Sequence, residues 1–145
     1  MCSSFATVRG LLHELSEPGW SVVVDTEASP EHLSRATTEA VELMFVVAEP
    51  YFKSLETARR YAQLGTELGI DEVAVLANKV RTVQDREAVE AFCGQHGLEL
   101  FAVIPYDEGL AVADREGVAP IDHDDASPVV RALGDVADRA MAVGP

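Results

Sequence analysis

The sequence predicts an α/β fold with three layers, in which a mostly parallel sheet carries helices on both faces. Short runs of aliphatic and β-branched residues alternate along the chain with longer segments of helical periodicity. Strands that alternate with helices form parallel sheets through right-handed crossovers. The 145 residues are 48% hydrophobic and contain no linker rich in proline, glycine or serine. We therefore expect a single domain over residues 1–145.

The first quarter of the chain predicts a helix, a strand and a second helix. Apolar residues recur at helical spacing over residues 7–15. Trp20–Asp25 contains three consecutive valines without polar alternation, which is typical of a strand buried on both faces. Ser29 and Pro30 together predict that a short helix begins near Glu31.

The remaining strands are apolar runs that end at a polar residue or a proline. They are predicted at Leu43–Ala48, Glu72–Ala77 and Glu99–Ile104.

The helices that follow these strands are recognised from their end signals. Ser54 predicts a cap for a helix to about Leu68, and Asp85 predicts a cap for a helix that Gly97 ends. A short helix is predicted over 109–115, and Ser127–Pro128 begins the last helix. The apolar stripe of that last helix comprises Val129, Val130, Leu133, Val136, Ala137, Ala140 and Met141.

The charge balance excludes several classes of partner. Eleven basic and 25 acidic residues give a net charge of −14, which disfavours nonspecific binding to nucleic acid or to anionic membranes. No apolar run approaches the roughly 18 residues of a membrane span. Two cysteines are too few for a disulfide framework, so we expect a cytoplasmic protein with reduced thiols.

Polar side chains follow three of the predicted strands, where ligands bind in parallel α/β sheets. Asp25 ends the first strand and is placed to hold Mg²⁺. Asn78 follows the third strand, and its amide can both donate to and accept from a purine edge; Lys79 comes next. The fourth strand ends in Pro105–Tyr106–Asp107, which offers flat apolar surface and an acceptor. Taken singly, each of these residues is also an ordinary turn or strand-end residue.

Taken together, these segments resemble the MinD/ParA-type P-loop ATPases. The resemblance extends over nearly the whole chain and is greatest to the carbon monoxide dehydrogenase maturation ATPases of the CooC type, which insert nickel. It is carried by Val-Val-Val-Asp-x-Glu-Ala from Val22, Glu31-His32-Leu33, Val46-Val47-x-Glu49-Pro50, Ser54-Leu55-Glu56-Thr57-Ala58, Asn78-Lys79-Val80 and Ile104-Pro105-Tyr106-Asp107.

The resemblance implies roles for the strand-end residues. Asp25 corresponds to the aspartate that holds the Mg²⁺ water shell and senses the terminal phosphate of ATP. Asn78 corresponds to the asparagine that reads adenine, and Pro105, Tyr106 and Asp107 to the loop that lines the base. Glu49–Pro50 matches a family motif to which we assign no chemical role at this point. ATP or ADP and Mg²⁺ are the implied cofactors.

The family's glycine-rich phosphate loop is not found in the sequence. None of the ten glycines lies in G-x-x-x-x-G-K-[ST], and no other segment resembles it. We therefore expect the chain to be the C-terminal portion of such a nucleotide-binding domain and unable to hydrolyse ATP alone. Met1 would be either an internal methionine of a longer protein or the start of a genuinely short one. Without a central strand between Trp20–Asp25 and Leu43–Ala48, either these two close on each other or two edges stay unpaired.

Cys2 is a candidate metal ligand by the same resemblance. In the maturation ATPases a Cys-x-Cys pair from two protomers can hold zinc or nickel, and Cys2 matches the second cysteine of that pair. Cys93, by contrast, lies on an apolar helix face and is expected in the core.

Three functions remain open at this stage. The first is a truncated ATPase-like protein of metal-centre assembly, acting as a homodimer or with a P-loop partner on a metalloenzyme client. The second is a non-catalytic module that binds and modulates a complete P-loop ATPase. A receiver or flavodoxin-like domain ranks last, because only Asp25 and Glu27 follow the first strand.

Overall fold

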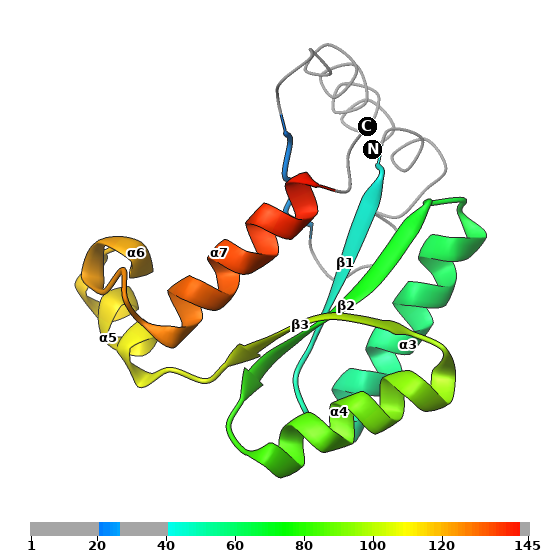
Figure 1. Ribbon diagram of the computed structural model, residues 1–145, viewed down its shortest axis with the longest axis horizontal. Helices are drawn as coiled ribbons and strands as arrows, with labels where there is room; N and C mark the ends of the chain where they lie inside the picture. The colour runs from blue at the N-terminus through cyan, green and yellow to red at the C-terminus, as the bar shows by residue number, and fades with distance from the viewer. Residues whose placement is uncertain (1–20, 27–40, 143–145) are drawn as a thin grey trace, which may run out of the picture.

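The computed structural model describes residues 21–26 and 41–142. Within these ranges, three strands form a parallel sheet in the order β1-β2-β3 (Figure 1). The strands are β1 Leu43–Ala48, β2 Glu72–Val80 and β3 Glu99–Pro105. The helices are α3 Phe52–Glu67, α4 Val83–His96, α5 Glu108–Glu116, α6 Pro120–His123 and α7 Pro128–Met141. The predicted α/β class and parallel sheet are confirmed.

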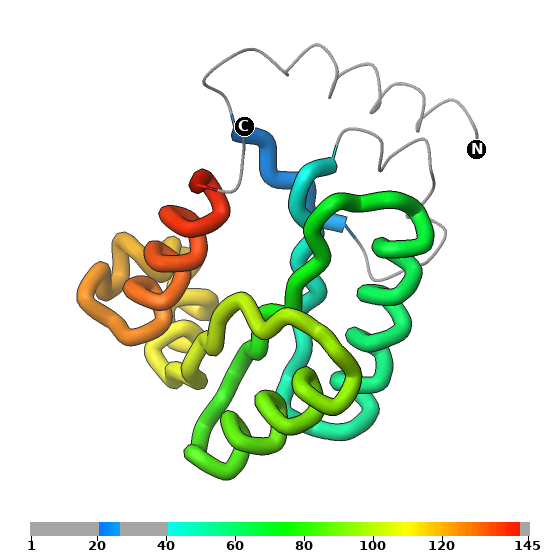
Figure 2. The backbone as a smooth tube through the Cα atoms, turned by 45° about the vertical axis from the view of Figure 1, so that its right-hand side comes forward, coloured from blue at the N-terminus to red at the C-terminus, as the bar shows by residue number. Residues whose placement is uncertain are grey.

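Both faces of the sheet are covered by helices. Helices α3 and α4 lie against one face, and α7 lies against the other (Figures 1 and 2). The α3/α4 face buries Leu55, Ala58, Ala62, Val89 and Cys93 against β1 and β2. The α7 face is smaller and buries Ala74, Leu76, Phe101 and Val136. The strands are therefore apolar on both sides, as the unbroken aliphatic runs in the sequence predict.

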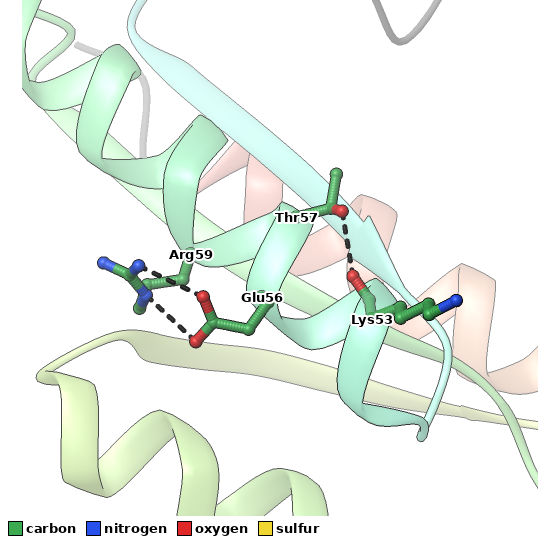
Figure 3. Close-up of polar contacts among 4 residues, drawn as sticks. All are labelled: Lys53, Glu56, Thr57 and Arg59. Atoms are coloured by element: carbon green, nitrogen blue, oxygen red, sulfur yellow. Dashed lines mark hydrogen bonds and ion pairs between the residues drawn. The ribbon is translucent and has the colours of Figure 1, made fainter.

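Helix α3 approaches the sheet closely because small residues line its inner face. Ala58, Ala62 and Gly65 are buried there. The outer surface of the helix is polar, and Figure 3 shows its local contacts. Arg59 donates to both carboxylate oxygens of Glu56, at 3.2 and 3.1 Å, and this hydrogen bonding lowers the pKa of Glu56. The predicted helix is confirmed, but its cap is Tyr51 rather than Ser54.

Helix α4 begins with a reciprocal cap. The Thr82 hydroxyl accepts the backbone N–H of Asp85, and the Asp85 carboxylate accepts the backbone N–H of Thr82, both at 3.0 Å. The predicted cap at Asp85 was thus three residues late, since Asp85 is the third residue of the helix. Gly97 ends α4 with φ +64°, as predicted.

Helix α7 attaches to the outer strand of the sheet through one long side chain. Arg139 donates to the backbone carbonyl of Phe101, and its guanidinium lies 4.0 Å from the centre of the Phe101 ring. The predicted apolar stripe is only partly used, because Val129 and Val136 are buried whereas Leu133 and Met141 are exposed. The reason is that α7 packs mainly on β3, so part of its apolar surface lies beyond the strand.

The strand predicted at Trp20–Asp25 is wrong over residues 21–25, which the structure describes. Residues 21–26 contain neither helix nor strand, and Val23 is 94% exposed. A strand needs hydrogen-bonding neighbours, and none of the described strands pairs with this segment. Residues 1–20 and 27–40 lie outside the described residues. The predictions that fall there are the helices at 7–15 and near Glu31, the first residue of the predicted strand, Trp20, and the candidate metal ligand Cys2.

Candidate functional site

The carboxyl ends of the three strands meet at one edge of the sheet, because the strands are parallel. Short contacts connect the segments that follow them. The backbone N–H of Tyr106, after β3, donates to the carbonyl of Val80 at the end of β2, at 2.9 Å. Lys79, also on β2, forms an ion pair of 2.9 Å with Glu49, which follows β1. The structure thus brings the segments that follow all three strands into one connected edge.

A hollow of about 480 Å³ opens beside the end of β3. Its walls combine flat apolar surfaces with charged groups, from Arg81, Pro105, Tyr106, Asp107, Glu108 and Pro128. The guanidinium of Arg81 lies over the Tyr106 ring, 3.4 Å from its centre. Stacked planar groups of this kind are suited to hold a planar aromatic ligand such as a nucleobase.

Asp107 has a structural task in this wall. It is the N-cap residue of α5, and its Oδ1 accepts the backbone N–H of Gly109 at 2.7 Å. The capping bond holds the loop Pro105–Asp107 against the start of the helix. The three predicted loop residues therefore do lie together in one wall of the hollow.

Asn78 and Lys79 lie inside β2, whereas the sequence predicted them just after it. The pairing of β2 with β3 shifts register between Ala77 and Val80, so these two residues bulge from the ladder. Lys79 has φ +57°, and the Asn78 side chain accepts the Lys79 backbone N–H at 2.9 Å. The strand continues past Asn78 because Val80 still pairs with Pro105.

The charges near Asn78 are already paired within the chain. The hydrogen bond to Glu49 raises the pKa of Lys79, so the amine stays protonated over a wide range. Glu49 is held in turn, because its backbone N–H donates to the Ser54 hydroxyl at 2.9 Å. Ser54 therefore fastens the loop after β1 instead of capping the helix from outside.

Asp25 is not joined to this edge by any hydrogen bond or ion pair between described residues, and it is exposed. Within 21–26 and 41–142, no three His, Cys, Asp or Glu side chains gather in a way that could hold a metal ion. A single exposed carboxylate can still hold Mg²⁺ through water molecules.

Two contributors to the site were missed from the sequence. Arg81 directly follows β2, and its stacking on Tyr106 depends on two segments 25 residues apart meeting in space. Pro128, at the start of α7, lines the same hollow and carries no local signal for a binding role. Cys93 is buried in the core as predicted, and burial raises the pKa of its thiol.

Comparison with known sequences finds ATP-binding proteins among the relatives of this chain, and no protein-family model matches it. It is 36% identical to the carbon monoxide dehydrogenase accessory protein CooC of Rhodospirillum rubrum, over 100% of this chain and 54% of CooC. It is 39% identical to an uncharacterized ATP-binding protein of Methanocaldococcus jannaschii, over 74% of this chain and 42% of that protein. The chain thus spans about half the length of the curated relatives it matches.

Solved structures with the same fold are cell-division and ParA-type ATPases. A ParA family ATPase from Chlorobium tepidum gives a TM-score of 0.76 at 20% identity, covering 97% of this chain and 57% of that one. MinD of Aquifex aeolicus gives 0.63 at 23% identity, covering 74% and 47%. MinD of Pyrococcus horikoshii, solved with Mg-ADP, gives 0.66 at 14% identity, covering 94% and 56%. In the described part of this chain, no helix is both long and apolar enough to traverse a bilayer.

Proposed function

Because the chain is similar to CooC and to an ATP-binding protein, and shares the fold of MinD/ParA-type ATPases, we propose that its strand ends form the adenine-binding side of an ATP site. The observation that carries this proposal is the connected edge at which the Tyr106 backbone N–H, in the loop Pro105–Asp107, donates to the carbonyl of Val80, two residues after Asn78 on β2. Planar and apolar groups beside a carboxamide suit a purine better than they suit a sugar or a peptide.

Each residue has a distinct task in this proposal. Asn78 reads the base edge, while Pro105 and Tyr106, with Arg81 stacked on Tyr106, form a flat wall beside it. Asp107 holds that wall to α5. Mg²⁺, when bound with the nucleotide, neutralises phosphate charge, and we assign Asp25 to its water shell.

Phosphate binding and hydrolysis need residues that we do not find in this sequence. Lys79 is paired with Glu49 and Arg81 is stacked on Tyr106, so neither is free to replace a phosphate loop. We propose that the 145 residues form the C-terminal portion of one nucleotide-binding domain, with the phosphate loop supplied by a further strand beside β1. Alone, this polypeptide is expected to bind adenine nucleotides weakly and not to hydrolyse ATP.

The biological role that we propose is assembly of a metal centre, by similarity to CooC. A nucleotide-dependent dimer would hand a metal such as nickel to a client metalloenzyme. Cys2 would contribute a thiolate to a metal site shared between protomers. A cytoplasmic location fits an ATP-dependent protein with the free thiol of Cys93.

The test measures, by titration calorimetry, how tightly the 145-residue chain binds ADP and GDP. Asn78→Ala is expected to weaken ADP binding by about tenfold, because a buried base edge loses its partner. Gln95→Ala is the matched control, since it removes an exposed carboxamide at the far end of α4. Equal binding of ADP and GDP by the unaltered chain would contradict the proposed adenine site. Saturable ATP hydrolysis by the unaltered chain would contradict the expected inactivity.

A second function is favoured by one specific observation, the free side of β1. Among the described strands β1 pairs only with β2, and Val47, the fifth of the six residues of β1, is 59% exposed. A non-catalytic module could accept a strand from a complete P-loop ATPase at this edge. Capture of a protein that contains a phosphate loop, with no ADP binding by the chain itself, would favour this second function.

A further inference from the structure

The ion pair between Glu49 and Lys79 lies directly beside the residue proposed to read the base. We infer that Glu49 is a positioning residue, which acts through Lys79 to hold the backbone of β2 so that the Asn78 carboxamide faces the base. This inference rests on the proposed adenine site and extends it to a residue without an assigned task.

The backbone at Lys79 needs support because it adopts an unfavourable conformation. Its φ of +57° is the only positive φ of a non-glycine residue in the part of the chain that the structure describes. The left-handed region crowds Cβ against the carbonyl oxygen of an L-residue. The register shift between Ala77 and Val80 also removes ladder support at this point. Strain of this kind persists only where surrounding contacts hold it.

Two contacts hold the strained residue, one on each side. The Asn78 Oδ1 accepts the Lys79 backbone N–H at 2.9 Å, and Lys79 Nζ reaches Glu49 Oε1 at 2.9 Å. Glu49 is itself anchored by Ser54 in the first turn of α3. The ion pair therefore connects the strained strand to a packed helix of the core.

The contact at Asn78 determines which atoms of its amide are available. Because Oδ1 is turned toward the Lys79 N–H, the NH₂ group is left as a donor for a purine ring nitrogen. The second lone pair of Oδ1 can still accept from an exocyclic amino group, which adenine has at the position where guanine has a carbonyl. Loss of this orientation would reduce the preference for adenine over guanine more than it reduces nucleotide binding as a whole.

Three variants separate positioning from a direct contact between Lys79 and phosphate. Glu49→Gln weakens the ion pair and keeps the side-chain length. Lys79→Ala removes the amine and keeps the unfavourable φ for an L-residue. Lys79→Gly removes the amine too, but glycine adopts positive φ without strain. Lys53→Ala is the control, because Lys53 is the other lysine of the chain and is exposed on α3.

The experiment measures amide hydrogen exchange at residue 79 by NMR and the ratio of ADP to GDP affinity, both in the full 145-residue chain. Glu49→Gln and Lys79→Ala are expected to speed exchange at residue 79 by about tenfold and to lower the ADP/GDP ratio by about fivefold. Lys79→Gly is expected to keep the ADP/GDP ratio of the unaltered chain, as is Lys53→Ala.

Each remaining outcome decides the matter. Unchanged exchange in Glu49→Gln overturns the inference, because the pair then holds nothing in place. A second result also overturns the inference: Lys79→Gly and Lys79→Ala lose affinity for ADP and GDP equally, and the ADP/GDP ratio stays unchanged. Lys79 would then contact the phosphates directly. If the unaltered chain binds neither nucleotide, the proposed function fails. The exchange data then still confirm or reject the mechanical role of Glu49.

Discussion

At the scale of single residues, the cap of α4 connects stability to the candidate site. The Asp85 carboxylate accepts backbone N–H groups from both Arg81 and Thr82, at 3.0 Å each. These bonds lower the pKa of Asp85, and the bond from the Arg81 N–H has the largest effect. The same carboxylate therefore fixes the start of the helix and the backbone of the residue whose side chain stacks on Tyr106.

We expect the contribution of Asp85 to stability to disappear in acid. A carboxyl group whose pKa is lower in the folded state stabilises the fold above its unfolded pKa of about 4. That stability is lost as the pH falls through the lower, folded pKa. Thermal melts should therefore show Asp85→Asn less stable than the unaltered chain at pH 6, with the difference closing below about pH 4.

Glu87→Gln is the control for this change, since it neutralises another exposed acid of α4. A difference between Asp85→Asn and the unaltered chain that persists unchanged to pH 3 would show that the carboxylate charge is not responsible. Thr82→Ala, which removes the reciprocal partner, should cost about 1 kcal/mol at pH 6.

At the scale of elements, a glycine in α3 and a glycine in α4 have opposite effects on the stability of the fold. On α3, a Cβ built at Gly65 would lie 2.8 Å from Met44 Sδ and 3.1 Å from Val73 Cγ2. On α4, a Cβ at Gly94 would meet no atom within 4 Å. The first glycine permits close packing of a helix on the sheet, whereas the second only weakens its helix.

Gly65→Ala and Gly94→Ala are expected to change stability in opposite directions. Alanine at position 94 should stabilise the chain by about 0.5–1 kcal/mol through helix propensity. Alanine at position 65 should destabilise it by about 1–3 kcal/mol net, because the β-branched side chain of Val73 cannot move aside easily. Urea unfolding monitored by circular dichroism measures both. A stabilising Gly65→Ala would mean that α3 and the sheet are less closely packed than the contacts indicate.

At the scale of the whole molecule, the sheet is covered unevenly. The α3/α4 face has a continuous core, but the α7 face is covered mainly over β3. Val47 lies on β1, at the opposite side of the sheet from β3, and is exposed. An apolar strand with one partner among the described strands offers backbone groups for pairing with another strand.

A charge on β1 is therefore expected to suppress association. Val47→Lys should reduce concentration-dependent oligomerisation, measured by sedimentation velocity, because a lysine on an edge strand disfavours further pairing. Val83→Lys is the matched control, since Val83 is 66% exposed and lies at the start of α4 rather than on a strand. Equal effects of both variants would assign the change to net charge instead of to the β1 edge.

Local sequence patterns were sufficient to predict the strands and helices that have a clear apolar run or clear end residues. Leu43–Ala48, the helix that Gly97 ends, and the Ser127–Pro128 start of α7 are where the sequence predicts them. Apolar runs, caps and left-handed glycines act over a few residues, so they can be read without a structure. The family resemblance likewise followed from the sequence, and the comparisons confirm it.

Only the tertiary structure decided what depends on contacts between distant segments. The strand expected at Trp20–Asp25 is absent over 21–26, because a strand exists only where a neighbour completes its hydrogen bonds. Asn78 lies within β2, because pairing with β3 extends that strand past the apolar run. The Glu49–Lys79 pair and the Arg81–Tyr106 stack join residues 30 and 25 positions apart. The sequence determined which chemical groups follow the strands, and the packing of the strands determined which of those groups meet.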